Sequence, residues 1–416
     1  MANSPAVKSG LAVNTFMLYV LTFSNYLFAF MTVPYQTRVL GPEIYGLLGF
    51  AFATMVYFQL VMDFGFMLSA TAEIAEAKGD RRKIAQICEA VSIGKMLLAL
   101  PCAGVLLVLC SAVPQFAADS TVFWFCLLYT IINSLIPDYL YRGMEQMAPI
   151  TYRTLLVKLI FTIGVFVFVK APGDYVLVPV FYLLGAVVAV GISFCDARKR
   201  FGLTVVRVTR RDVFSRIAAS SPFFVSRIAS TAYGATNTMI LGLLYPGQSL
   251  LGHYTSAEKV VSLVRTGASP ISDSLYPYLI RSRNFGPVWR ILSLAMPAVV
   301  AGAALLWVYA PQICAFVFGA EYEAAALPLR CLMPVIVFVL PSYVFGFPLM
   351  TPLGIARYAN LSVVLGAVVQ LVLLAGLYLA SMLTLASVCV ATSITETFVL
   401  VFRVVVVCIY LKKHKV

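Results

Sequence analysis

The sequence carries little charge for its length. Only 11% of its 416 residues are charged, while 61% are hydrophobic, and the mean hydropathy is +0.94. Because a soluble domain has about 25% charged residues, this chain has too few polar side chains to cover soluble surfaces. A helix that crosses a bilayer needs about 20 mostly apolar residues. The composition therefore predicts an all-α integral membrane protein.

Residues that usually carry chemistry are also scarce. Two histidines, His253 and His414, nearly exclude imidazole catalysis, and the nine cysteines lack the paired short spacings of a disulfide framework or a zinc site. The sequence has no phosphate-binding loop and no soluble segment long enough for a nucleotide-binding domain. We therefore expect no metal, no cofactor and no enzymatic activity.

Apolar runs bounded by charge, proline and glycine predict about twelve transmembrane helices. Their expected ranges are 11–36, 44–70, 86–112, 120–141, 151–170, 176–196, 214–245, 251–279, 289–310, 325–348, 357–380 and 384–410. An even number of spans places both termini on the same side of the membrane.

The basic residues indicate which side that is. A net charge of +13 would suit a nucleic-acid partner, but the lysines and arginines lie in short segments between the apolar runs. Of the 30, 21 fall on the side of the termini, and two, Arg38 and Lys170, fall on the other. Cytoplasmic loops carry such an excess. We therefore expect cytoplasmic termini and no nucleic-acid partner.

The longest polar stretch, about residues 196–216, divides the predicted helices into two groups of six. It predicts an N-terminal lobe, 1–205, and a C-terminal lobe, 206–416, joined by a basic cytoplasmic linker. A faint repeat around Gly46 and Gly252 supports this division, although proline and glycine here could simply mark tight turns. Repeated halves are common in transporters that bind substrate between the halves near the midplane.

Basic residues inside the predicted spans are the first candidates for function, because a charge at the bilayer centre costs at least about 2.5 kcal/mol. They outnumber acidic residues at comparable depth. A positive cavity would suit an anionic substrate, and phosphate is the natural candidate because guanidinium and ammonium groups neutralise it. We predict that Arg227 and Arg265, with Lys259, line such a cavity. Alternatively, Lys95, Lys158 and Arg403 reach an interface with their charged ends.

Acidic residues at comparable depth are the candidates for gating or for coupling to an ion gradient. They are Glu258, Asp273 and Glu396 within spans and Asp63 near the end of one. Asp138 also lies near a span end but is not one of these candidates. Glu258 and Arg265 lie seven positions apart on one helical face, so the alternative is an ion pair that only locks helices.

Two stretches carry a specific signature. The first contains Asn25-Tyr26, Pro34-Tyr35, Thr37 to Gly46, Asp63-Phe64-Gly65-Phe66 and Ser69-Ala70-Thr71. The second contains Ser226-Arg227-Ile228-Ala229, Asn237, Leu241-Gly242, Gly252-His253-Tyr254, Ala257-Glu258-Lys259, Pro270 and Leu275 to Tyr278, followed by Phe318 to Tyr322. Together they resemble the oligosaccharide flippases that export O-antigen, capsule and related repeat units. The resemblance extends over about residues 14 to 410 and departs from the usual pattern at Tyr245-Pro246-Gly247-Gln248.

The resemblance implies the fold of the multidrug and oligosaccharide exporter superfamily, in which two six-helix lobes form a V around a central cavity. The implied substrate is an oligosaccharide on undecaprenyl diphosphate, moved from the cytoplasmic to the periplasmic leaflet of the bacterial inner membrane by alternating access. At matching positions, it assigns diphosphate binding to Arg38, Arg227, Lys259 and Arg265. Asp63 is expected to pair with Arg38 or to take part in gating. A polysaccharide polymerase and a chain-length regulator are candidate partners besides membrane lipid.

Three other functions stay open from the sequence. A drug or cation exporter on the same fold should have an acidic cavity, whereas the buried excess here is basic. A membrane polymerase or glycosyltransferase of the same pathway should carry catalytic residues in a long periplasmic loop, and the predicted loops on that side are short. A purely structural membrane partner should tolerate neutralisation of its buried charges.

Overall fold

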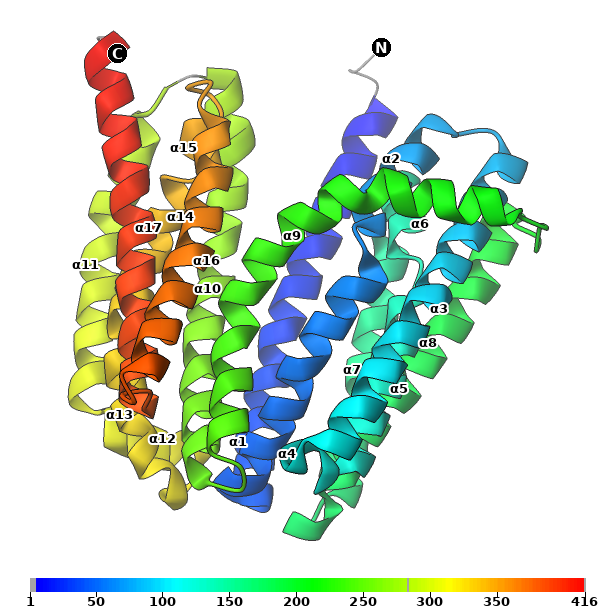
Figure 1. Ribbon diagram of the computed structural model, residues 1–416. Coiled ribbons are helices and arrows are strands. Elements are labelled where there is room, and N and C mark those ends of the chain that lie inside the picture. Colours follow the sequence, from blue (N-terminus) through cyan, green and yellow to red (C-terminus); the bar gives the residue numbers. More distant parts are fainter. Residues whose placement is uncertain (1–4, 283, 415–416) are drawn as a thin grey trace. The chain divides into compact units, whose positions relative to one another are not determined.

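The protein is helical throughout the part of the chain that the structure, a computed structural model, describes (Figure 1). It describes residues 5–282 and 284–414, with the side chains of all of these except residues 5–16, 18, 225, 226, 229–233, 273, 277 and 414. The first elements are α1 (Pro5–Asp63), α2 (Phe66–Glu76), α3 (Arg81–Ala112), α4 (Pro114–Ala117), α5 (Ser120–Ser134), α6 (Asp138–Gly143), α7 (Ala148–Phe168), η1 (Pro172–Val176), α8 (Leu177–Phe201) and α9 (Arg210–Leu244). The others are α10 (Ser249–Ser282), α11 (Gly286–Val308), α12 (Ala310–Phe318), η2 (Ala320–Ala325), α13 (Ala326–Cys331), α14 (Met333–Val344), α15 (Phe347–Met350), α16 (Ala356–Leu379) and α17 (Leu385–His414).

Backbone contacts divide the chain into two compact units. Unit 1 comprises the residues up to Leu40 together with Phe50–Thr231, and unit 2 comprises Gly41–Gly49 together with the residues from Ala232 onward. Helices α1 and α9 therefore contribute to both units. In unit 1, α5 packs on α8 and α8 on α7, and in unit 2, α14 packs against α10, α11 and α17.

Nine segments of the described chain are long and apolar enough to cross a membrane. They are Tyr19–Glu76, Arg81–Ala112, Ser120–Gly143, Ala148–Phe168, Pro172–Phe201, Gly286–Val308, Met333–Met350, Ala356–Leu379 and Leu385–Lys413. Tyr19–Glu76 combines the predicted spans 11–36 and 44–70. Helices α9 and α10, predicted as spans 214–245 and 251–279, are not among the nine, which comprise described side chains only, and both helices contain residues outside that set.

The outward faces of these helices suit lipid rather than water. Large apolar side chains such as Leu294, Phe316 and Leu379 are about four-fifths exposed. In the most apolar stretch of α11 only 6% of the residues are buried. Such surfaces are unstable in water but favourable in hydrocarbon. The chain is therefore a multi-pass membrane protein.

Close backbone contacts at glycine residues hold the N-terminal end of α10 in unit 2. The chain turns at Gly41, whose φ of 74° favours glycine. A Cβ on Gly46 would lie 2.6 Å from the backbone nitrogen of Gly252, and a Cβ on Gly252 would lie 1.9 Å from the carbonyl oxygen of Pro42. The two glycines that the sequence relates as a repeat therefore pack directly against each other.

The family-like motifs of unit 2 meet beside these glycines. His253 shares a hydrogen bond of 3.0 Å between its Nε2 and the carbonyl oxygen of Glu321. Its ring lies edge-on to Tyr322, which also contacts Tyr45 and Phe318. These residues fix the corner where Gly41–Gly49, α10 and η2 come together.

Candidate functional site

The four predicted cationic residues differ in burial and in partners. In unit 1, Arg38 is exposed near the end of the first part of α1, and Arg227 is half-buried on α9. In unit 2, Lys259 is exposed on α10, whereas Arg265 is half-buried six residues further along the same helix. Six residues correspond to about 600° of helix rotation, so these two point in different directions. Their shared role in substrate binding stays a prediction.

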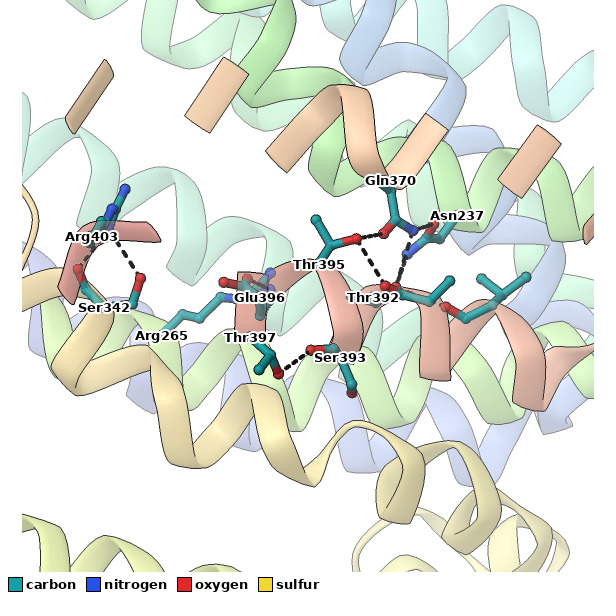
Figure 2. Close-up of polar contacts among 12 residues, drawn as sticks. Asn237, Arg265, Ser342, Gln370, Thr392, Ser393, Thr395, Glu396, Thr397 and Arg403 are labelled. Carbon is teal, nitrogen blue, oxygen red and sulfur yellow. Dashed lines mark hydrogen bonds and ion pairs between the residues drawn. The ribbon is translucent and has the colours of Figure 1, made fainter. Parts of the chain in front are cut away.

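Arg265 is neutralised by a carboxylate on a neighbouring helix. Its Nη2 lies 2.6 Å from Oε1 of Glu396 on α17 (Figure 2). The alternative drawn from the sequence is a pair within α10 between Arg265 and Glu258, whereas this ion pair joins two helices. The observed pair connects α10 to α17 and lowers the positive charge that Arg265 offers to a substrate.

The predicted acidic residues also differ in burial and in partners. Asp63 accepts a hydrogen bond from Gln59 and forms an ion pair with Lys95, with 3.2 Å between Lys95 Nζ and Asp63 Oδ1. The expected Asp63–Arg38 pair is thus wrong, because about 22 residues of helix, or about 33 Å, separate Asp63 from the turn that follows Arg38. Glu258 is half-buried on α10. The Asp273 side chain lies outside the described residues.

Buried cations of unit 1 are paired with carboxylates in places that the sequence did not indicate. Lys95 is 4% exposed and also donates to the carbonyl oxygen of Ser134. Arg153, near the start of the predicted span 151–170, is buried in α7, where it contacts Asp138 and donates to Ser193 Oγ at 2.8 Å. The sequence could not reveal this pair, because the position of Arg153 close to the edge of an apolar run suits a loop equally well.

Arg216 forms a comparable contact at the start of α9. It pairs with Glu73 of α2. Nearby, the hydroxyls of Ser69 and Ser220 lie 2.7 Å apart, and the rings of Phe64 and Phe224 stack with 4.4 Å between centroids. The first part of α9, expected to belong to the polar linker, is therefore packed against α2 within unit 1.

A neutral polar network lies in the interior of unit 2. Asn237 Nδ2 donates to Thr392 Oγ1 at 2.8 Å, and Gln370 Nε2 donates to Asn237 Oδ1 at 2.9 Å. Thr395 Oγ1 donates to Gln370 Oε1 at 2.8 Å. Figure 2 shows these side chains pointing toward one another from α9, α16 and α17. Because buried polar groups are costly unless hydrogen-bonded, the network fixes the register of three helices.

Arg403 of α17 is the buried cation of a second polar group in unit 2. Its side chain is held by hydrogen bonds from Nε to Ser362 Oγ at 2.8 Å and from Nη1 to the carbonyl oxygen of Ser342 at 2.6 Å. At 8% exposure, Arg403 does not extend to an interface as the sequence suggested. Lys95 does not either. Arg403 lines a pocket of about 530 Å³ beside α10, α14 and α15.

The charged and neutral polar groups described above join helices within each unit. Among the described residues, no three His, Cys, Asp or Glu side chains gather in a way that could hold a metal ion. Charged and amide groups that join helices can bind polar ligands, stabilise the packing, or exchange partners when helices move.

Comparison with known proteins places these features in a family. Residues 11–283 match the model of the family described as "Polysaccharide biosynthesis protein". A protein of Escherichia coli (strain K12) named "Putative O-antigen transporter" is 27% identical over 349 residues, which cover 82% of this chain and 84% of that protein.

Solved structures support the fold at low sequence identity. The lipid II flippase MurJ, in an inward closed conformation, has a TM-score of 0.69 and 12% identity, covering 95% of this chain and 87% of that one. An inward-facing multidrug resistance MATE transporter of the MOP superfamily has a TM-score of 0.63 and 14% identity, covering 93% and 98%. Since the family model matches more than half of the sequence, the chain belongs to the polysaccharide biosynthesis protein family and has a membrane transporter fold.

Proposed function

We propose that this chain is a flippase for lipid-linked oligosaccharides. Its substrate is an oligosaccharide repeat unit, of O-antigen or a similar surface polysaccharide, carried on undecaprenyl diphosphate. The chain moves it from the cytoplasmic to the periplasmic leaflet of a bacterial inner membrane. The observation that carries this proposal is that one chain joins a polysaccharide biosynthesis sequence to a fold like that of a lipid II flippase.

The proposed mechanism is alternating access by two lobes of six helices each, 1–205 and 206–416, joined by the basic segment 196–216. Both termini are cytoplasmic, as the distribution of lysine and arginine favours. The lobes expose a cavity first to the cytoplasm and then to the periplasm, while the polyprenyl tail stays in lipid. No bond of the substrate is made or broken, so the chain acts as a transporter and not as an enzyme.

The proposed binding residues are cations that can face the diphosphate. They are Arg38, Arg227, Lys259 and Arg265, of which Arg265 must exchange Glu396 for a phosphate oxygen before it can contribute. Asp63, Glu258 and Asp273 are proposed to take part in gating or ion coupling. A polysaccharide polymerase and a chain-length regulator are proposed partners that receive the exported unit.

The decisive experiment removes the gene and follows the lipid-linked intermediate. We expect loss of the surface polysaccharide and accumulation of undecaprenyl-diphosphate-linked repeat units in the cytoplasmic leaflet, both reversed by the wild-type chain. Unchanged surface polysaccharide would contradict the proposal. The fold likeness to MATE transporters supports a second candidate, a drug exporter. That candidate predicts altered drug susceptibility with normal polysaccharide.

A further inference from the structure

A pocket near the start of α3 in unit 1 combines an acid, a base and apolar walls. It has a volume of about 190 Å³ and is lined by α3, α6, the last turns of α8 and the segment that follows α8. Since one water needs only about 10–15 Å³ of such a volume, the pocket can admit a polar group of several atoms. Its polar side chains are Cys88, Glu89, Ser92, Tyr139, Cys195, Arg198 and Thr204.

The more buried side of this pocket offers hydrogen-bond acceptors. Glu89 and Ser92 are half-buried one turn apart on α3, and Tyr139 is buried beside them. Ser92 Oγ donates to the carbonyl oxygen of Cys88 at 2.9 Å, and the Tyr139 hydroxyl donates to the same oxygen at 3.4 Å. Because each hydroxyl donates its one proton to Cys88, only its lone pairs are left for a ligand. A carboxylate with two accepting hydroxyls suits an ammonium group.

The exposed side of the pocket offers hydrogen-bond donors. Arg198, in the last turn of α8, and Thr204, in the segment after it, are both exposed. The neighbouring Arg200 differs, since its Nε lies 2.6 Å from Oδ1 of Asp196. Guanidinium and hydroxyl groups donate hydrogen bonds to phosphate oxygens.

The acidic and the basic side of the pocket are separate from each other. The ion pairs among the described residues do not include one between Glu89 and Arg198. Lys95, whose Nζ lies 5.7 Å from the centre of the Tyr139 ring, is paired with Asp63 instead of Glu89. A ligand that carries both an ammonium and a phosphate can therefore meet opposite charges at its two ends.

The ends of the lining helices place the pocket near the boundary between membrane and water. Helix α3 begins with Arg81, Arg82 and Lys83, and the last turn of α8 contains Arg198, Lys199 and Arg200. Such basic clusters lie outside the hydrocarbon. Helix α3 has 32 residues, or about 48 Å, which exceeds the hydrocarbon core of about 30 Å, and Glu89 lies only about 12 Å from its start. Phospholipid headgroups lie at this depth.

The walls of the pocket are apolar and continue onto the outer surface of the helices. They are formed by Ala85, Pro137, Leu140, Phe194, Ala197, Leu203 and Val205. Phe194 is 48% exposed and Val205 is 82% exposed. A small soluble zwitterion would leave these side chains uncovered, whereas the acyl chains of a lipid can pack against them.

We propose that this pocket binds the headgroup of a phospholipid that carries an ammonium and a phosphate, as phosphatidylethanolamine does. Glu89, Ser92 and Tyr139 accept hydrogen bonds from the ammonium, and Arg198 and Thr204 donate to the phosphate. The bound lipid connects α3 and α6 to the end of α8. This inference does not depend on the proposed function, because it concerns a lipid of the surrounding membrane and not the exported substrate.

The test is native mass spectrometry of the purified full-length chain in detergent with defined phospholipids. Wild-type protein should bind phosphatidylethanolamine more tightly than phosphatidylglycerol, which has no ammonium. It should also bind phosphatidylethanolamine more tightly than phosphatidylcholine, which keeps the positive charge but has no N–H group to donate to Glu89. Phosphoethanolamine, which lacks acyl chains, should compete far more weakly than the lipid.

Two variants assign the two ends of the headgroup. Glu89→Gln should weaken binding of phosphatidylethanolamine by about 5- to 10-fold, because a half-buried charge-assisted hydrogen bond is lost, and should not weaken binding of phosphatidylglycerol. Arg198→Gln should weaken binding of both lipids by about 2- to 5-fold, since an exposed charge is screened. Glu76→Gln and Lys199→Gln make the same changes of charge at exposed positions outside the pocket and should bind like the wild type.

The outcomes decide the proposal at each end of the ligand. Wild-type affinity for phosphatidylethanolamine in both pocket variants overturns the site, and an equal loss of both lipids in Glu89→Gln overturns the ammonium contact. If Glu89→Gln does not fold, equal binding of phosphatidylcholine and phosphatidylethanolamine by the wild type overturns that contact instead. Competition by phosphoethanolamine as strong as that by the lipid overturns the assignment to a lipid.

Discussion

Buried polar groups are stabilised differently in the two units. In unit 1, Lys95, Arg153 and Arg216 each contact a carboxylate, from Asp63, Asp138 and Glu73 respectively. In unit 2, the Arg265–Glu396 pair follows the same pattern. The network around Gln370 instead consists of neutral amide and hydroxyl groups, and serine oxygens accept hydrogen bonds from Arg403.

This difference affects how each unit can respond to an anionic ligand. Removing one partner of a buried ion pair costs about 3–5 kcal/mol, because a charge is left buried. Removing a neutral hydrogen-bond partner costs about 1–3 kcal/mol. A diphosphate near Lys95 or Arg153 would have to replace a bound carboxylate. The neutral network around Gln370 in unit 2 can exchange partners at lower cost.

The largest expected effect tests the close backbone packing at Gly252 in unit 2. Gly252→Ala places a Cβ 1.9 Å from the backbone oxygen of Pro42, and neither atom belongs to a flexible side chain. We expect a loss beyond about 5 kcal/mol, the exceptional range for one substitution, and little folded protein in the membrane. Gly376→Ala, where nothing lies within 4 Å, is the matched control. Equal abundance of the two variants would contradict the packing.

The second effect tests the ion pairs of unit 1. Lys95→Met leaves Asp63 without its ammonium partner and should lower the free energy of unfolding by about 3–5 kcal/mol. The double variant Lys95→Met with Asp63→Asn removes both charges and should recover much of this loss. Chemical unfolding in detergent measures all three proteins. If the double variant is no more stable than Lys95→Met, the pair is not what stabilises this region.

The third effect tests the neutral network of unit 2. Gln370→Leu removes the amide that contacts Asn237 and Thr395, and should cost about 1–3 kcal/mol because those groups lose a buried partner. Since none of these side chains titrates, the loss should be the same at every pH at which the protein is folded. If Gln370→Leu lowered the free energy of unfolding as much as Lys95→Met, the neutral network of unit 2 and the ion pairs of unit 1 would not differ in strength.

The sequence predicted the fold class and the family better than the partners of the charges. Composition and apolar runs indicate membrane helices directly, because lipid requires about 20 apolar residues per span. The ion pairs instead join residues far apart in the chain, such as Glu73 and Arg216. Which carboxylate meets which cation depends on tertiary packing, and so does the depth of Arg403, because a helix of 30 residues exceeds the length needed to span the bilayer.

The signature around Gly46 and Gly252 shows a further limit. From the sequence, its two parts suggest an internal repeat, with glycine at equivalent turns. In the structure they contact each other, and His253 with Tyr322 completes the same corner. The motif residues there are required by close backbone packing. The sequence pattern alone does not reveal that the segments around Gly46 and Gly252 are in contact.

The smallest expected effect concerns an ion pair at the surface of unit 1. Lys78 lies 2.8 Å from Glu145, and both side chains are largely exposed. The Lys78 ammonium lowers the pKa of the Glu145 carboxyl below its usual value of 4.5. A lowered carboxyl pKa contributes stability above the unfolded-state pKa, and that stability is lost as the pH falls through the folded-state pKa.

We therefore expect Glu145→Gln to lower stability slightly at about pH 6.5, and by less at about pH 3, because the lower pH protonates more of the wild-type carboxyl. The difference at the higher pH should stay below about 1 kcal/mol, because water and salt screen exposed pairs. Thermal unfolding of both proteins at the two pH values measures it. If Glu145→Gln lowered the free energy of unfolding as much as Lys95→Met, burial would not determine the strength of the ion pairs in unit 1. The difference between the two units could then not be explained by the burial of their charges.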